Sequence, residues 1–139
     1  MGNKDTNRTG LNDQRSIGVF DSGIGGLTVA NAINRVLPKE HLIYFGDTAH
    51  LPYGDKSADA IRYYALRISK FLLEQECKMI IIACNSASAA ASDMLLDFFE
   101  GKILFANVID PLVQHTIDKG YQNVGVIATK ATIGSNVYH

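Results

Sequence analysis

A cysteine followed by two small polar residues, Cys84, Asn85 and Ser86, is the group of side chains best suited to chemistry in this sequence. It comes directly after the apolar run at residues 79–83 and directly before an alanine-rich stretch. The pattern predicts a buried strand that ends at Cys84 and a helix that Asn85 and Ser86 cap. The free N–H groups at a helix N-terminus favour thiolate over thiol, so the sequence predicts a reactive sulfur at Cys84.

The alternative for Cys84 is a small buried core side chain, which is a common environment for cysteine. Asn85 and Ser86 argue against it, because they bring hydrogen-bonding groups that an apolar filler does not need. The other cysteine, Cys77, lies at a predicted helix end and is expected to be inert. The sequence has no CxxC pair and no Cys/His spacing typical of metal sites, so neither a metal site nor a disulfide framework is expected, and a reducing cytoplasm is the default location.

A carboxylate and a hydroxyl, Asp21 and Ser22, follow another predicted strand at residues 16–20. They begin the segment DSGIGGLT at residues 21–28, whose glycines let the backbone turn tightly before a helix. This segment is not a dinucleotide fingerprint, because Thr28 stands where GxGxxG requires its last glycine. A plain tight turn is the alternative, and the polar pair at the strand end favours a binding role.

A long polar loop at residues 47–57, DTAHLPYGDKS, follows the predicted strand at residues 41–46. Loops of this kind commonly shape binding sites, and the PYG sequence at residues 52–54 lies in its middle. His50 could act as a base there, although a solvated loop histidine is the more common case.

Short apolar runs that alternate with amphipathic stretches indicate the elements that must position these side chains. Strands are predicted at residues 16–20, 41–46, 78–83, 103–108 and 123–129, and helices at residues 27–37, 58–76, 85–100, 110–119 and from 132 onward. Such alternation is typical of a parallel sheet, whose strands all end at one edge. We therefore predict an α/β fold of three layers, a mainly parallel sheet with helices on both faces, with the site at that edge.

Composition limits the partners of the 139-residue chain. Its net charge is −1, 47% of its residues are apolar, and it lacks a basic cluster with interleaved aromatic residues, so nucleic acid is not an expected partner. Its longest apolar runs, such as residues 79–83, are far too short to span a bilayer, so a membrane is not expected either. Residues 1–15 are polar and aperiodic, which predicts a mobile tail.

Four segments carry a resemblance to a known family. They are DSGIGGL at residues 21–27, DTAHLPYG at 47–54, IIIACNSASA at 80–89 and VGVIATKATIGSNVY at 124–138. In this order they resemble the first half of the glutamate racemase family, which belongs to the cofactor-independent aspartate/glutamate racemase superfamily. The resemblance implies a two-domain α/β isomerase that interconverts L- and D-glutamate, supplies D-glutamate for peptidoglycan, and uses no cofactor or metal.

The resemblance also implies roles for individual residues. Cys84 would be the first of two catalytic cysteines, facing the α-hydrogen of D-glutamate, and Asp21 would help to set the protonation of the thiol. Substrate contacts are implied for Asp21, Ser22, Pro52, Tyr53, Gly54, Asn85 and Ser86. Residues 16–107 would form the N-terminal part of the first domain, and residues 108–139 the truncated start of a second, similar domain.

The sequence departs from the family pattern in two places. The usual Cys-Asn-Thr is Cys-Asn-Ser here, which keeps the hydroxyl and loses a methyl group. The second cysteine, in a Thr-Cys-Thr-His context, has no counterpart in these residues. Inversion of an α-carbon requires a base on each face, so we expect this chain to be inactive alone.

Three alternatives remain open at this point. The chain could belong to an aspartate or hydantoin racemase with the same thiol chemistry, to a small-anion or nucleotide-binding α/β module that is not an enzyme, or to a folded fragment without activity. A small-molecule substrate is the expected partner, and a homodimer is left open.

Overall fold

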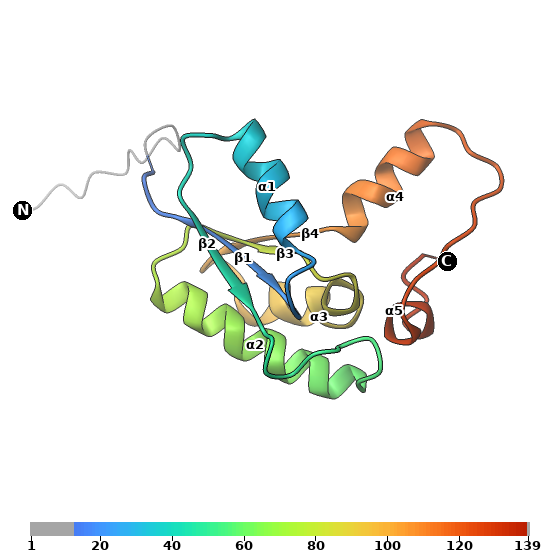
Figure 1. Cartoon of the computed structure of the whole chain (residues 1–139), viewed down its shortest axis with the longest axis horizontal. Helices are drawn as coiled ribbons and strands as arrows, with labels where there is room; N and C mark the ends of the chain where they lie inside the picture. Colours follow the sequence, from blue (N-terminus) through green and yellow to red (C-terminus); the bar gives the residue numbers. More distant parts are fainter. Residues whose placement is uncertain (1–12, 139) are drawn as a thin grey trace, which may run out of the picture.

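The strands of the chain form one parallel sheet in a computed structural model that describes residues 13–138 (Figure 1). The strands are β1 (Ile17–Asp21), β2 (Leu42–Gly46), β3 (Met79–Ile82) and β4 (Leu104–Asn107). Their order across the sheet is β2-β1-β3-β4, and every neighbouring pair is parallel. Residues 1–12 of the predicted tail lie outside the described residues.

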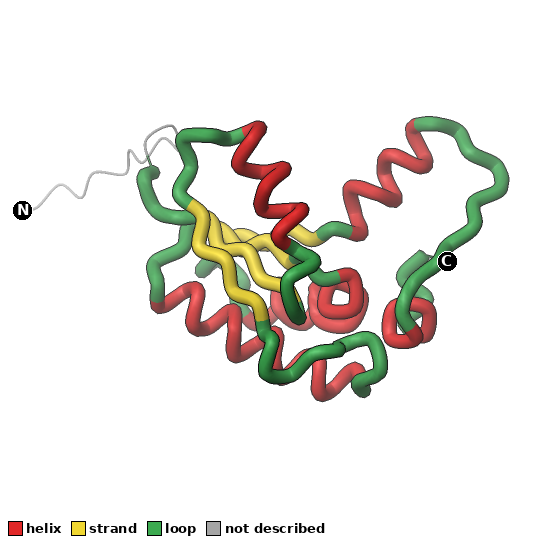
Figure 2. The backbone as a smooth tube through the Cα atoms, viewed as in Figure 1, coloured by secondary structure: helices red, strands yellow, loops and turns green. Residues whose placement is uncertain are grey.

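Helices cover both faces of the sheet. The helices of the described residues are α1 (Leu27–Val36), α2 (Ala58–Glu74), α3 (Asn85–Phe98), α4 (Ile109–Asp118) and α5 (Lys130–Gly134), and the first three lie on the sheet. Figure 2 shows α1 on one side of the strands and α2 and α3 on the other. Phe20, Ile80 and Ile82 pack toward α2 and α3, whereas Val19 packs toward α1. The predicted three-layer α/β fold is confirmed, because alternate side chains of the central strands are buried on opposite faces.

The predicted fifth strand at residues 123–129 is wrong. This segment is exposed and irregular, and the Ile127 side chain is fully exposed. The segment lies away from the sheet, between α4 and α5 (Figure 1). A strand requires a neighbour that accepts and donates its backbone hydrogen bonds, and no strand within residues 13–138 pairs with this segment.

Helix capping partly differs from the prediction. Cys84 itself is the N-cap of α3, so Asn85 and Ser86 are its first helical residues. At α4 the capping side chain is Asn107, which lies before the predicted helix start at residue 110 and whose Oδ1 accepts the N–H groups of Ile109 and Asp110 at 2.9 Å each. Side-chain capping depends on which oxygen reaches the free N–H groups, and several neighbouring residue types can supply it.

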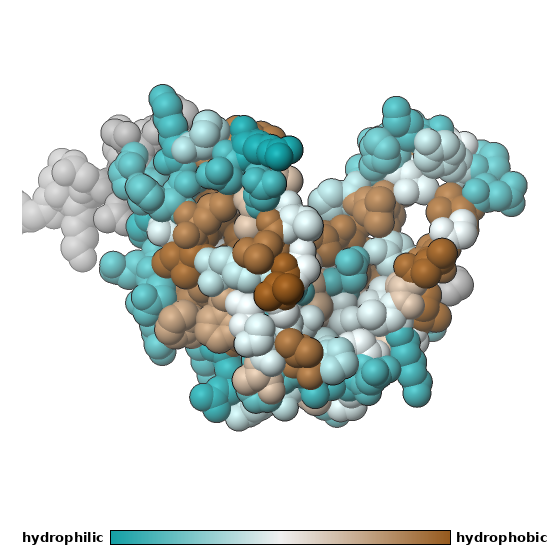
Figure 3. Space-filling view, in the orientation of Figure 1, coloured by the Kyte–Doolittle hydropathy of each residue, from teal (hydrophilic) through white to brown (hydrophobic). Residues whose placement is uncertain are grey.

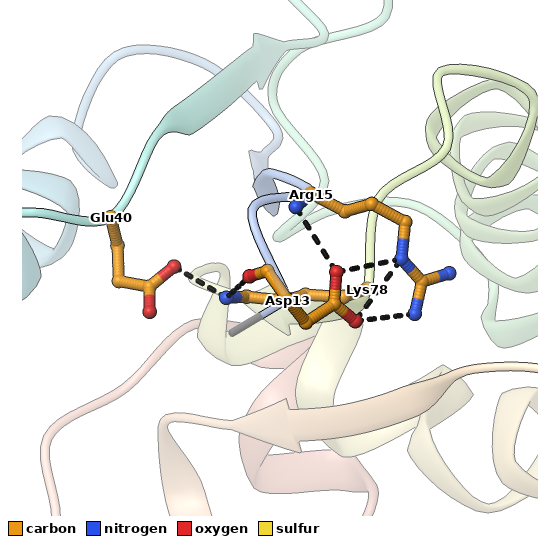
Figure 4. A network of polar contacts seen from close by, with 4 residues as sticks. All are labelled: Asp13, Arg15, Glu40 and Lys78. Carbon is orange, nitrogen blue, oxygen red and sulfur yellow. Dashed lines mark hydrogen bonds and ion pairs between the residues drawn. The ribbon is translucent and has the colours of Figure 1, made fainter. Parts of the chain in front are cut away.

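A polar network joins three segments at the amino edge of the sheet (Figure 4). Lys78, just before β3, lies 2.6 Å from the Glu40 carboxylate and donates to the Asp13 carbonyl oxygen at 2.7 Å. Arg15 forms an ion pair with Asp13 at 2.6 Å, and this hydrogen-bonded pair holds the pKa of the Asp13 carboxyl well below its usual range. These contacts tie the chain before β1 to the starts of β2 and β3, at the end of the sheet opposite the site described below.

Two buried serines lead to a prediction about stability. The Ser69 hydroxyl has no hydrogen-bond partner within the described residues, whereas the equally buried Ser88 hydroxyl donates to the Ile82 carbonyl oxygen at 3.1 Å. We expect Ser69→Ala to raise the free energy of unfolding by about 0.5–1 kcal/mol, because it removes an unsatisfied group from a helix. Ser88→Ala should lower it by about 1 kcal/mol.

Urea denaturation followed by circular dichroism measures both changes. The Ser88→Ala variant is the matched control, because it deletes the same atom from a site where that atom is bonded. A Ser69→Ala variant less stable than Ser88→Ala would show that the Ser69 hydroxyl has a partner in solution.

Candidate active site

An open cleft of about 800 Å³ lies at the carboxyl edge of the sheet. Its walls come from the segments that follow β1, β2 and β3, together with the start of α5. All of the predicted site residues line it: Asp21, Ser22, Pro52, Tyr53, Gly54, Cys84, Asn85 and Ser86. The structure therefore brings together three segments that are distant in the sequence, while the role of each residue remains a prediction.

The Cys84 sulfur lies where β3 passes into α3, and the residue is only 6% exposed. Its Sγ accepts the Ala87 backbone N–H at 3.4 Å and donates to the Ser22 hydroxyl at 3.5 Å. One side of the sulfur thus faces the N-terminus of a helix and the other a hydroxyl group of the neighbouring segment. The residue lies at the predicted junction of strand and helix, and it is part of the cleft wall as well as part of the core, while the reactivity of its thiol stays a prediction.

The Asp21 carboxylate is buried beside this thiol. Its Oδ2 accepts the Gly26 backbone N–H at 2.9 Å, and its Oδ1 lies 3.5 Å from the Ser22 hydroxyl. Ser22 therefore stands between the carboxylate and the Cys84 sulfur, so that a hydroxyl links the two groups. The glycine-rich turn places them there, because a Cβ on Gly26 would lie 2.7 Å from the Asp21 Cβ.

The tyrosine of β2 closes the glycine-rich turn from the side of the neighbouring strand. This residue is Tyr44, and its hydroxyl donates to the Gly23 carbonyl oxygen at 3.0 Å. Burial, and then the negative charge of Asp21, raise the pKa of Tyr44 to about 12. The phenol therefore remains a donor at neutral pH and holds the turn against the sheet.

Asp47, for which no local pattern predicts a role, is buried beneath the PYG loop. The Tyr53 hydroxyl donates to Asp47 Oδ2 at 2.5 Å, and His50 Nδ1 lies 2.7 Å from Oδ1. Burial, and then the hydrogen bond to Asp47, raise the pKa of the Tyr53 phenol well above its usual value. His50 is not among the residues that line the cleft, so the structure does not support the suggestion that it acts there as a base.

Thr129 and Lys130, for which no role was predicted, line the cleft from the far end of the chain. The Thr129 hydroxyl lies 2.8 Å from the Ser86 hydroxyl, and the Ala131 N–H donates to the Gly54 carbonyl oxygen at 2.9 Å. The threonines of TKAT in the segment at residues 124–138 were the available signal, but nothing local shows that the first of them reaches a serine 43 residues earlier.

The cleft combines one thiol with groups that can bind a small polar molecule. Cys77 does not contribute, because it is 1% exposed at the opposite edge of the sheet and burial raises its pKa. Backbone N–H groups, hydroxyls and the Asn85 amide can bind carboxylates, whereas Asp21 can bind an ammonium group. One thiol of this kind can exchange a proton with only one face of a bound molecule.

Within the described part of the chain, no helix combines the length and the apolar character that crossing a membrane requires.

No family model matches the chain. It is 47% identical over 126 residues to the glutamate racemase of Limosilactobacillus reuteri, an alignment that covers 91% of this chain and 46% of that enzyme. The glutamate racemase of Chlorobaculum parvum is 49% identical over 125 residues, with 88% and 45% covered.

The solved structures similar to this chain are glutamate racemases as well. A glutamate racemase from Francisella tularensis in complex with D-glutamate superposes with a TM-score of 0.85 and 49% identity, covering 91% of this chain and 47% of that one. A glutamate racemase from Thermus thermophilus in complex with β-chloro-D-alanine has a TM-score of 0.83 and 44% identity, with 90% and 47% covered. The α/β fold is therefore that of glutamate racemases, and the chain spans about half the length of the curated relatives it matches.

Proposed function

We propose that this chain is the N-terminal half of a glutamate racemase, an isomerase that interconverts L- and D-glutamate without a cofactor. The observation that carries the proposal is the placement of Cys84, Ser22 and Asp21 on one cleft, in a chain 49% identical to a racemase solved with D-glutamate. The other predicted site residues surround the same cleft, so that groups suited to an amino acid's carboxylates lie beside the thiol.

In the proposed reaction the Cys84 thiolate removes the α-proton of D-glutamate, and a second group on the opposite face, which starts in its protonated form, gives its proton to the same carbon. The sulfur gains the proton as the carbon–hydrogen bond breaks. The electron pair of that bond stays on the substrate until the group on the opposite face donates its proton to the α-carbon. Donors around the α-carboxylate, of which Ser86 and Asn85 are candidates, would stabilise the developing negative charge. Asp21 would act on the thiol through Ser22 and would also attract the substrate ammonium group.

The second base would come from the half of the protein that this chain does not include. We propose that residues 16–107 belong to the first domain and residues 108–139 begin a second α/β domain. The support is that apolar side chains of this region are exposed, as Figure 3 shows for the part that Figure 1 labels α4 and α5. They include Leu112, Ile117, Tyr121, Val124, Val126 and Ile127.

The proposed activity also implies a role and a location in the cell. D-Glutamate made by such an enzyme would enter peptidoglycan, which links the protein to cell-wall biogenesis and cell shape, and a free catalytic thiol fits a reducing cytoplasm. The proposed partner is the small-molecule substrate alone, with homodimerisation left open.

Incubation with L- or D-glutamate in D₂O, without any cofactor, tests the proposal. We expect the full-length protein to racemise both enantiomers and to exchange the α-hydrogen for deuterium, as measured by NMR and polarimetry. The 139-residue chain alone should racemise at least about 1000-fold more slowly, because it provides one of the two bases.

Two outcomes would count against this assignment. Racemisation by the 139-residue chain at the rate of the full-length protein would contradict the two-base mechanism. A full-length protein that racemises aspartate but not glutamate would contradict the assigned substrate, and aspartate is therefore the control substrate.

A further inference from the structure

We infer that Asp47 is a positioning residue whose buried carboxylate fixes the Tyr53 side chain, so that the backbone of residues 52–54 is presented to the substrate. The inference rests on the proposed function and deepens it. It assigns Asp47 no contact with the reacting atoms, because Asp47 lies behind the cleft wall and is not among the residues that line the cleft.

Asp47 is attached to the rigid part of the fold. It directly follows β2, and its backbone N–H donates at 2.9 Å to the carbonyl oxygen of Asp21, at the end of β1. The residue is 6% exposed, and both carboxylate oxygens are used, one by Tyr53 and one by His50. A buried carboxylate requires such partners, because an unsatisfied one would be strongly destabilising. The carboxylate is therefore a fixed point from which a loop can be held.

Tyr53 connects this fixed point to the cleft. Its side chain is 1% exposed, and its ring packs on Tyr64 of α2 with 5.8 Å between the centroids. The hydroxyl reaches Asp47 at 2.5 Å, and the raised pKa of the phenol keeps it a donor. The flanking residues Pro52 and Gly54 line the cleft. A displacement of the ring would therefore displace the backbone on both sides of it.

His50 contacts the other oxygen of the same carboxylate. Its ring stacks on Tyr64 at 4.2 Å between the centroids, and its Nδ1 lies 2.7 Å from Asp47. Asp47, His50, Tyr53 and Tyr64 thus form a closed cluster that holds both ends of the loop at residues 47–53 on α2. Preorganisation of a binding loop reduces the ordering cost of binding, so loss of the cluster should weaken substrate binding more than it slows the chemical step.

The test uses Tyr53→Phe and Asp47→Asn, singly and together, in the full-length protein. Tyr53→Phe keeps the packed ring and removes only the donor, and Asp47→Asn keeps the shape and removes the charge. We expect the KM for D-glutamate to rise about tenfold in Tyr53→Phe, with kcat within about threefold of the parent. The double variant should have a KM no higher than the worse single variant, because both changes break the same contact.

Tyr63→Phe is the matched control. It removes a phenol hydroxyl from α2, where that group accepts a hydrogen bond from Arg67 at 3.1 Å on an exposed surface outside the cleft. Its kcat and KM should equal those of the parent. An unchanged KM in Tyr53→Phe, multiplied effects in the double variant, or a loss of kcat of about 1000-fold at constant KM would each overturn the positioning role.

Amide hydrogen exchange without substrate separates this inference from the proposed function. The Lys56 N–H donates to the Tyr53 carbonyl oxygen at 3.0 Å, so its exchange should become about tenfold faster in Tyr53→Phe, while amides of α3 keep the parent rate. A parent that does not racemise glutamate would refute the proposed function, and this exchange would still decide whether the loop is anchored. Unchanged exchange at Lys56 would overturn the anchoring itself.

Discussion

Replacing Cys84 with serine in the full-length protein is expected to slow α-proton exchange from D-glutamate by about 10³- to 10⁴-fold. A hydroxyl ionises far less readily than a thiol, so the variant lacks the base that we propose for the D-enantiomer. The Cys84 sulfur also accepts the Ala87 N–H and caps α3, and serine is a good N-cap residue. The serine variant therefore removes the chemistry while it keeps the cap.

Deuterium incorporation at the α-carbon, followed by NMR for each enantiomer, measures this loss. Cys77→Ala is the control, because it deletes the other thiol from the buried amino end of β3, distant from the cleft. It should exchange at the parent rate, although the lost core sulfur lowers stability. Turnover that survives Cys84→Ser undiminished would exclude Cys84 as the base and would refute the proposed mechanism.

Replacing Gly26 with alanine is expected to disrupt the cleft. A Cβ at this position would lie 2.7 Å from the Cβ of Asp21 and 2.9 Å from the Cβ of Ala83. Asp21 ends β1, and Ala83 directly follows β3 with its N–H bonded to the Phe20 carbonyl oxygen, so the turn after β1 or the segment before Cys84 must shift. We expect the free energy of unfolding to fall by about 1–3 kcal/mol and kcat/KM to fall about 100-fold, because small displacements of positioned groups are costly.

Gly25→Ala provides the stability control at the adjacent position. The nearest atom to its added Cβ would be Asp21 Oδ2 at 3.7 Å, which is an ordinary van der Waals contact. Urea denaturation should therefore show a change below about 0.5 kcal/mol for Gly25→Ala and the larger loss for Gly26→Ala. Equal stability of the two variants would mean that the contact between Gly26 and Asp21 is looser than the structure indicates.

The resemblance to racemases and the geometry of the cleft support each other in different ways. Identity near 47% assigns the chain's relatives, but it does not show which side chains meet. The cleft shows that Asp21, Ser22 and Cys84 lie together, but a thiol beside a hydroxyl and a carboxylate fits more than one reaction. The need for a base on each face of the substrate connects the sequence identity with the geometry of the cleft. It explains why half of a racemase should contain one thiol on the cleft.

The sequence by itself determined the four strands of the sheet and the edge at which Cys84 and Asp21 lie. Hydrophobic periodicity is a local property, and an alternation of strands and helices places all strand ends at one edge of a parallel sheet. Both residues could therefore be assigned to the same edge from their positions directly after apolar runs, although they are 63 positions apart.

Only the tertiary structure decided which side chains meet across the chain. Asp47 became a buried anchor for Tyr53, His50 faced away from the cleft, and Thr129 reached Ser86. The segment at residues 123–129 has a strand-like sequence but no strand beside it within the described chain. Hydrogen-bond partners and strand pairs depend on packing between distant segments, and no local pattern of residues encodes that packing.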